Sequence, residues 1–170
     1  DYKPTAYCRK FSHKSLPVIK ITSGDTLVSE SVDAGGFDKT GKRVTERGNP
    51  LTGPFYIEGA LPGDVVAITL TRVSLNRDYA TTLENFVKRS LPLEVIKPVF
   101  ARNAKLVKWT LDRNTGYAFP QNVHEHLSKF NVPLKPFLGC IGVAAPLKDK
   151  EPLSYFAGAF GGNMDFYGCT

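Results

Sequence analysis

Residues Asn49–Asp64 read NPLTGPFYIEGALPGD, and three prolines and three glycines surround the short apolar run FYIEGA. Glycine and proline mark turns at both ends of this run, which predicts a short, rigid β-strand. Strand alternation puts Phe55 and Ile57 on one face and Glu58 on the other. Glu58 is therefore either a solvent-facing carboxylate, the default for a lone glutamate in a strand, or the carboxylate of a preorganised site.

Size and composition indicate a globular protein. The 170 residues are enough for one ordinary domain or two very small ones. Hydrophobic residues make up 42% and charged residues 22%, which is normal for a chain with a core. No apolar run approaches the roughly 18 residues of a membrane span, so no membrane partner is expected. The compartment stays open between the cytoplasm and, if a signal peptide has been removed, the periplasm.

The charge distribution argues against a nucleic-acid-binding protein, and the cysteines argue against a disulfide scaffold. The formal charge is +6, but the lysines and arginines are scattered in runs no longer than a pair, so no nucleic-acid partner is expected. The three cysteines are an odd number without metal-type spacing, so a disulfide scaffold is not expected. Cys140 lies in an apolar run, where a thiol is usually an inert packing residue. The chain has no Gly-x-Ser-x-Gly elbow and no glycine-rich phosphate loop before a helix.

Twelve prolines and fifteen glycines punctuate the chain, so long helices are not expected. Apolar alternation, clearest in DVVAITLTRV, predicts strands. The predicted strands cover residues 16–21, 26–32, 64–73, 104–112 and, as two short pieces around a bend, 132–144. Short helices are predicted over residues 81–90 and 122–129. The predicted fold class is mainly β with one or two short helices.

Two loops combine glycines with oxygen donors. In GAFGGNMD (158–165), an extended backbone would point Asn163 and Asp165 the same way, as an amide oxygen and a carboxylate that suit a hard cation. The alternative is a polar loop, since Gly, Asn and Asp favour turns. In VDAGGFD (32–38), Asp33 and Asp38 flank a Gly-Gly pair, which is either a cation loop or simply a loop.

The sequence HEH places His124 and His126 two residues apart. On a strand they would share a face and could ligate zinc. The surrounding segment is more typical of a helix, where residues two apart point in different directions. The segment is therefore interpreted as surface rather than as a metal site.

Three stretches together resemble one family. NPLTGPFYIEGALPGDVV, PFLGCIGVAAP and GGNMD are similar, in this order, to the signature blocks of the acetamidase/formamidase family of amide hydrolases. WTLDRNTG is similar to a branch of that family. The resemblance runs from SLPVIKITSGDTL to the end of the chain. It implies β-sandwich and β-barrel elements, and an enzyme that hydrolyses short carboxamides to carboxylate and ammonia.

The resemblance also implies a divalent metal, zinc or calcium, and a water that this metal activates. Asp165 is the leading candidate ligand, Asn163 belongs to the same loop, and Asp33 is a further candidate. Glu58 becomes the candidate catalytic acid-base group, which would take a proton from water and return it to the leaving nitrogen. The implied partner is a small amide substrate.

The chain departs from the family pattern in two histidines and in length. Cys8 stands where an early histidine is common, and Phe160 stands where many members have histidine before GGNMD. The resemblance implies about as much chain again after GGNMD. Residues 1–170 are therefore expected to be the N-terminal portion of an acetamidase/formamidase-like protein, as a homo-oligomer or with a C-terminal half. The alternative is a non-catalytic β-sandwich module that binds a ligand or partner.

Overall fold

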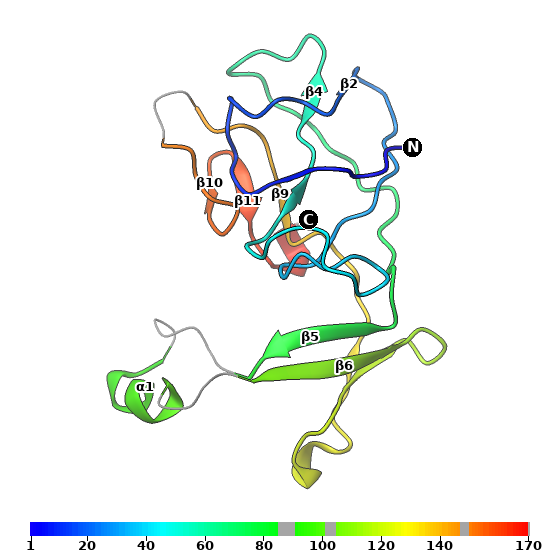
Figure 1. Ribbon diagram of the computed structural model, residues 1–170, viewed down its shortest axis with the longest axis vertical. Helices are drawn as coiled ribbons and strands as arrows, with labels where there is room; N and C mark the ends of the chain where they lie inside the picture. Colours follow the sequence, from blue (N-terminus) through cyan, green and yellow to red (C-terminus); the bar gives the residue numbers. More distant parts are fainter. Residues whose placement is uncertain (85–90, 101–104, 147–149, 170) are drawn as a thin grey trace. The chain divides into compact units, whose positions relative to one another are not determined.

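The structure is a computed structural model that describes residues 1–84, 91–100, 105–146 and 150–169. The chain divides into two compact units. The first unit combines Asp1–Asn76 with Pro136–Thr170, and the second is the intervening segment Arg77–Lys135. Figure 1 shows this division along the sequence, with both ends of the chain in the first unit.

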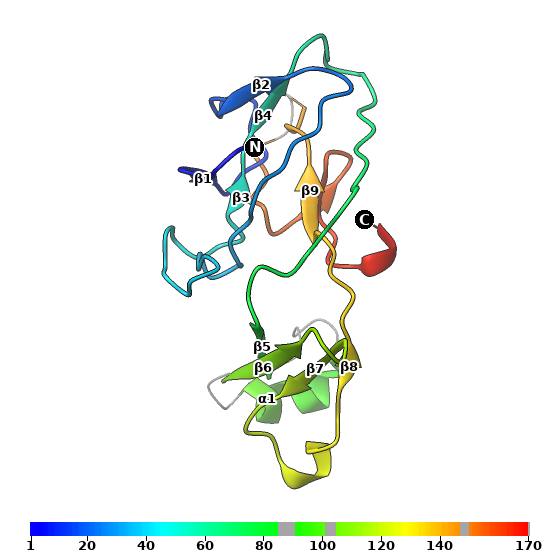
Figure 2. The same ribbon diagram turned by 90° about the vertical axis from the view of Figure 1, so that its right-hand side faces the viewer.

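The described part of the first unit contains three small sheets (Figures 1 and 2). Strands β1 and β3 pair antiparallel, β2 and β4 pair parallel, and β11 lies between β10 and β9 in an antiparallel sheet. The elements of this unit are β1 (Tyr7–Cys8), β2 (Ile19–Ile21), β3 (Leu51–Thr52), β4 (Phe55–Ile57), β9 (Cys140–Gly142), β10 (Ala157–Gly158), β11 (Gly161–Asn163) and the 3-10 turn η3 (Tyr167–Cys169).

The proline- and glycine-framed run forms β4, as its sequence predicts. Its parallel partner is the predicted strand around residues 16–21, with Ile19 opposite Phe55 and Ile21 opposite Ile57. Phe55 and Ile57 are half-buried, whereas Tyr56 between them is exposed. The Phe55 ring meets the Tyr2 ring edge-on at 5.5 Å between centroids. Strand alternation is therefore confirmed here, because the apolar face has a neighbouring strand and ring to pack against.

The second unit is built on one antiparallel sheet in the order β5-β6-β7-β8. The predicted strand at 104–112 is confirmed as β6, in the centre of this sheet. Its Leu111 pairs with Ala118, and both side chains are buried. The elements of this unit are β5 (Tyr79–Leu83), α1 (Leu93–Phe100), β6 (Leu106–Asp112), β7 (Tyr117–Pro120), the 3-10 turn η2 (Glu125–Leu127) and β8 (Val132–Pro133).

Two predicted strands are wrong. Residues 64–73, the clearest alternating run, lie in no strand, and residues 26–32 make only a single bridge, from Ser29 to Tyr2. The physical reason is that period-two alternation describes side chains, whereas a strand also needs a neighbouring edge to hydrogen-bond with. No such edge borders 64–73 among the described residues. The apolar run 132–144 does give two short strands, β8 and β9, as predicted.

The helix predictions are corrected as well. Residues 81–83 of the predicted helix 81–90 belong to β5, where Thr81 and Thr82 pair with Lys108 and Val107, and residues 85–90 lie outside the described residues. Cross-strand pairing of β-branched threonines outweighs the weak helix signal. The predicted helix 122–129 shortens to η2. The helix that forms, α1, was missed because Pro98 lies within it, and proline normally ends a helix.

The fold class is thus mainly β, as predicted, in several small sheets with one short α-helix in the described residues. These residues close no barrel. Where the structure describes burial, few hydrophobic residues are buried: Phe11 and Ala145 in the first unit and Leu111 and Ala118 in the second. In the described residues, no helix is long and apolar enough to cross a membrane.

Candidate functional site

The GGNMD loop is held by the three-stranded sheet of the first unit. Asn163, the last residue of β11, stands opposite Cys140, the first residue of β9. Its main-chain N–H donates to the carbonyl of Phe156 at 3.0 Å, and its side-chain amide donates to the carbonyl of Tyr155 at 3.4 Å. The amide nitrogen of Asn163 is thus used inside the fold, which leaves its oxygen as the atom able to take a ligand.

Asp165 leaves β11 with a positive φ of 44°, a conformation that Asp and Asn tolerate better than most residues. The main-chain N–H groups of Met164 and Asp165 both donate to the carbonyl of Gly139, each at 2.9 Å. The Asp165 carboxylate lies against the Gly139 backbone, where a side-chain carbon would collide with its Oδ1. Glycine at 139 therefore allows this close approach, and the Asp165 carboxylate is exposed.

Cys140 lies beside this carboxylate and is half-buried. Its Sγ donates weakly to the carbonyl of Ser154, at 3.5 Å. Burial first, and the negative charge of Asp165 second, raise the pKa of the Cys140 thiol to about 11. A thiol with this pKa is almost entirely protonated at neutral pH, which agrees with the packing role that its apolar surroundings predict.

Asp33 organises the VDAGGFD loop. Its Oδ1 accepts hydrogen bonds from the N–H groups of Gly35 and Phe37, both at 2.9 Å, and its carbonyl accepts one from Gly36 at 2.9 Å. The side chain is half-buried. This is the geometry of an Asx turn, so at least one carboxylate oxygen of Asp33 stabilises the loop.

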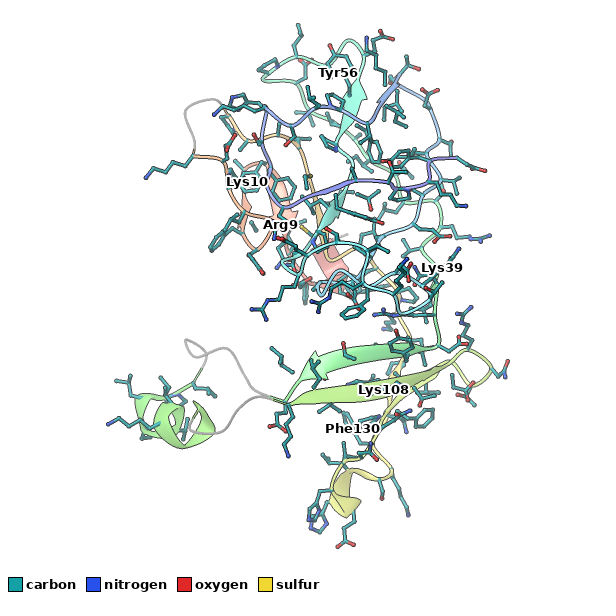
Figure 3. All side chains as sticks on the ribbon, viewed as in Figure 1. Arg9, Lys10, Lys39, Tyr56, Lys108 and Phe130 are labelled. Atoms are coloured by element: carbon teal, nitrogen blue, oxygen red, sulfur yellow. The ribbon has the colours of Figure 1, made fainter. Side chains whose placement is uncertain are left out.

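Glu58 follows β4 directly. Its N–H donates to the carbonyl of Ile21 at 2.8 Å, which extends the β2–β4 pairing by one residue. The Glu58 side chain is exposed, and in the described part of the chain its carboxylate accepts no hydrogen bond. Tyr56, labelled in Figure 3, is also exposed. The Nζ of Lys20 lies 5.7 Å from the centroid of the Tyr56 ring.

The candidate site residues are therefore fixed locally but are not gathered into one centre. Within residues 1–84, 91–100, 105–146 and 150–169, no three His, Cys, Asp or Glu side chains come together to hold a metal ion. β11 ends at Asn163, and Asp165 follows with a positive φ of 44°, so the extended backbone that would point both side chains the same way is not continued at Asp165. The proposed metal ligands and the proposed catalytic role of Glu58 stay predictions.

The histidine pair in the second unit differs from expectation in one respect. The rings of His124 and His126 stack, with centroids 4.6 Å apart, instead of pointing apart. The reason is that His124 precedes the short turn η2 as its N-cap, and its Nδ1 accepts a hydrogen bond from the N–H of His126 at 3.4 Å. Both side chains are exposed.

The sequence did not predict an open surface depression of about 690 Å³ in the first unit. Its lining residues are Arg9, Arg43, Val44, Thr45, Glu46 and Arg47. Arg9, labelled in Figure 3, forms an ion pair with Glu46 at 2.7 Å and donates to the carbonyl of Arg47 at 3.3 Å. The only signal in the sequence was the basic run KRVTER (42–47), because Arg9 is brought to it by the fold.

Comparison with known proteins adds to this geometry. No family model matches the chain, and no curated protein matches its sequence significantly. Solved structures do resemble the chain, among them the following two. An acetamidase from Bacillus halodurans has 21% identity and a TM-score of 0.64, with 98% of this chain and 53% of the other covered. A predicted acetamidase/formamidase from the thermophile Thermoanaerobacter tengcongensis has 26% identity and a TM-score of 0.68, with 97% and 51% covered.

The chain is thus a mainly β protein that, over nearly its whole length, has a fold similar to these two solved structures. The resemblance to the acetamidase/formamidase family, which the motif blocks predicted, is thereby confirmed. The chain spans about half the length of each of these structures.

Proposed function

We propose that this chain is part of an enzyme that hydrolyses short linear carboxamides to carboxylate and ammonia. The observation that carries the proposal is the likeness to the Thermoanaerobacter tengcongensis protein at 26% identity over 97% of the chain. The three motif blocks also support it, and they lie in β3, β4 and the residues that follow, in β9, and in β11. The comparisons do not favour the alternative of a non-catalytic module, which becomes an outcome of the test.

The donor chemistry of the β11 loop agrees with a hard divalent cation such as calcium, or with zinc. Asp165 would contribute a carboxylate oxygen and Asn163 its amide oxygen, with Asp33 as a further candidate. Two or three oxygens do not complete the shell of either ion, so water or further protein groups would fill the remaining positions. A bound metal of this kind polarises an amide carbonyl and lowers the pKa of bound water.

In this proposal, the residues of this chain would hold the Asp165 carboxylate in place and would transfer a proton from water to the leaving nitrogen. The double hydrogen bond to the Gly139 carbonyl fixes the backbone that carries Asp165, so its carboxylate is presented from a rigid turn. Glu58, exposed at the end of β4, would accept a proton from the attacking water and give it to the leaving nitrogen. Without protonation the nitrogen would have to leave as the strongly basic NH2− anion, so this transfer is needed for C–N cleavage to release ammonia.

The test measures ammonia release from formamide, acetamide and propionamide by the intact gene product, with zinc, with calcium and with chelator. The expected result is turnover that Asp165→Asn lowers at least a hundredfold, together with loss of bound metal by elemental analysis. Asp25→Asn is the matched control, because Asp25 is an exposed carboxylate that only caps the turn at Thr22. Absence of turnover with every amide would refute the amidase proposal and favour the binding module.

Asp165 is tested separately from the activity. If the intact protein turns over amides and Asp165→Asn behaves like Asp25→Asn in both rate and metal content, Asp165 is not a ligand. Glu58→Gln should lower the rate while leaving metal content unchanged, because its proposed role is proton transfer rather than coordination.

A further inference from the structure

The arginine-lined depression of the first unit has an unbalanced charge. Three of its six lining residues are arginines, and Glu46 is the single acid among them, so the lining carries a formal net charge of +2. Glu46 pairs with Arg9 and is 78% exposed, so it orients one guanidinium group and leaves the charges of Arg43 and Arg47 unbalanced. Cations held close together repel one another, and a bound anion would relieve this repulsion.

The guanidinium groups of Arg43 and Arg47 have unused hydrogen-bond donors. In the part of the chain that the structure describes, neither group donates to a protein acceptor or forms an ion pair. The guanidinium carbon of Arg43 lies 4.7 Å from the centroid of the Phe37 ring, and the main chains of these two residues form an antiparallel bridge. Stacking on a ring orients a guanidinium group while its edge N–H groups stay able to donate. Carboxylates and phosphates bind to such donors.

The main chain of residues 43–48 is fixed by the fold. The N–H of Val44 donates to the carbonyl of Gly36 at 2.9 Å, and the N–H of Gly48 donates to the carbonyl of Ala34 at 2.9 Å. The wall of the depression is therefore tied at both ends to the loop VDAGGFD. A site carried by a fixed main chain loses less conformational entropy when a ligand binds.

We propose that this depression binds a small organic dianion, either a phosphate monoester or a dicarboxylate, with Arg43 and Arg47 as its direct contacts. Each planar guanidinium group can donate two parallel hydrogen bonds to carboxylate or phosphate oxygens, and two such groups match two negative charges. The volume of about 690 Å³ is within the range of small-molecule sites, about 300–1,000 Å³. An organic group therefore has room beside the anionic one, and Val44, 42% exposed, offers it an apolar contact.

This depression and the candidate metal loop use different residues. Neither Asp165, Asn163 nor Glu58 lines the depression. The inference therefore does not depend on amide hydrolysis, and each of the two proposals can fail without the other. The alternative is three solvated surface arginines, which would attract any anion weakly and would lose this attraction in salt.

The test is isothermal titration calorimetry of the intact gene product with phenyl phosphate, with succinate and with acetate. At about pH 7.5 the first two are dianions, whereas acetate is a monoanion. About 0.1 M salt screens nonspecific attraction between exposed charges. The expected result is saturable binding of at least one dianion, about tenfold tighter than acetate, because the second charge adds a further charge-assisted contact.

Variants assign the binding to the depression. Arg43→Gln and Arg47→Gln should each weaken it about tenfold, because each removes a pair of charge-assisted hydrogen bonds. Arg72→Gln is the matched control and should bind like the unchanged protein, since Arg72 is an exposed arginine of the same unit that does not line the depression. Arg47→Lys keeps the charge without the planar fork and should also weaken binding. All three arginines are exposed, so circular dichroism should show an unchanged fold.

The outcomes separate the two ligand classes and can overturn the proposal. Tighter binding of phenyl phosphate assigns a phosphate monoester, tighter binding of succinate assigns a dicarboxylate, and both results support the site. Three results would overturn it. They are no saturable binding of either dianion by about 10 mM, which is tenfold above the usual range for small ligands, acetate binding as tightly as the dianions, and equal affinity in Arg43→Gln, Arg47→Gln and Arg72→Gln.

Discussion

Ser154 offers a sharp test of how the first unit is held together. It is the only fully buried side chain among the described residues, with 0% exposure. Its hydroxyl donates to the carbonyl of Gly48 at 3.1 Å, and its N–H donates to the carbonyl of Arg9 at 2.9 Å. One residue thus connects segments more than a hundred positions apart in the sequence, and we predict that Ser154→Ala destabilises this unit.

The magnitude follows from burial. Alanine leaves the buried Gly48 carbonyl without its donor, and an unsatisfied buried acceptor costs about 1–3 kcal/mol. Ser29→Ala is the matched control, because the Ser29 hydroxyl donates a similar bond to the carbonyl of Tyr2, at 3.0 Å, in an exposed position. Water replaces an exposed donor, so this change should cost no more than about 0.5 kcal/mol.

The assay is native-state hydrogen exchange followed by mass spectrometry on peptides that contain Gly48 and Ser154. A loss of 1 kcal/mol speeds exchange about fivefold when opening is the limiting equilibrium. Tryptophan fluorescence does not report this change, since Trp109 is the single tryptophan and belongs to the second unit. Equal exchange in Ser154→Ala and Ser29→Ala would refute the reasoning that burial sets the cost.

Three further predictions concern charge, thiol reactivity and backbone conformation. The pKa of Glu151 is lowered to about 2, first by the hydrogen bond from the Ser12 hydroxyl and then by the hydrogen bond from Lys10. The ionised Glu151 carboxylate therefore contributes fully to the stability of the folded state above about pH 4.5, and this contribution is lost as the pH falls towards 2. Glu151→Gln should therefore flatten the acid side of a thermal-stability profile between pH 4.5 and 2, and an unchanged slope would contradict this. The rate of Cys140 alkylation by iodoacetamide should rise about tenfold per pH unit up to about pH 11. Asp165→Asn should raise this rate at pH 8, because it removes one cause of the raised pKa of the thiol. A rate that levels off near pH 9 would show that the pKa of Cys140 is not raised. Gly36→Ala should lower the melting temperature more than Gly24→Ala. Both glycines have a positive φ, but only at Gly36 would the added carbon collide with a main-chain carbonyl. Equal decreases in melting temperature would show that the positive φ alone sets the cost.

Much of the candidate site follows from residue types. Glycine, asparagine and aspartate in GGNMD predicted a loop that carries oxygen donors, and the structure ends β11 at Asn163, with Asp165 in the loop that follows. The packing of the Asp165 carboxylate against Gly139 could not be predicted, because it depends on the pairing of β9 with β11, about twenty residues apart. The arginine-lined depression was missed for the same reason, since Arg9 is far from residues 43–47 in the sequence.

The sequence by itself determined the local features of this protein. Proline and glycine framing identified β4, apolar alternation identified β6, and turn residues identified the loops at Asp33 and Asp165, because these patterns act through neighbouring residues. Only the tertiary structure decided which strand-like runs become strands. Residues 55–57 pair with 19–21, whereas the more regular run 64–73 stays unpaired among the described residues. The physical reason is that a β-strand is completed by hydrogen bonds to another segment, so its own residues cannot specify that it forms.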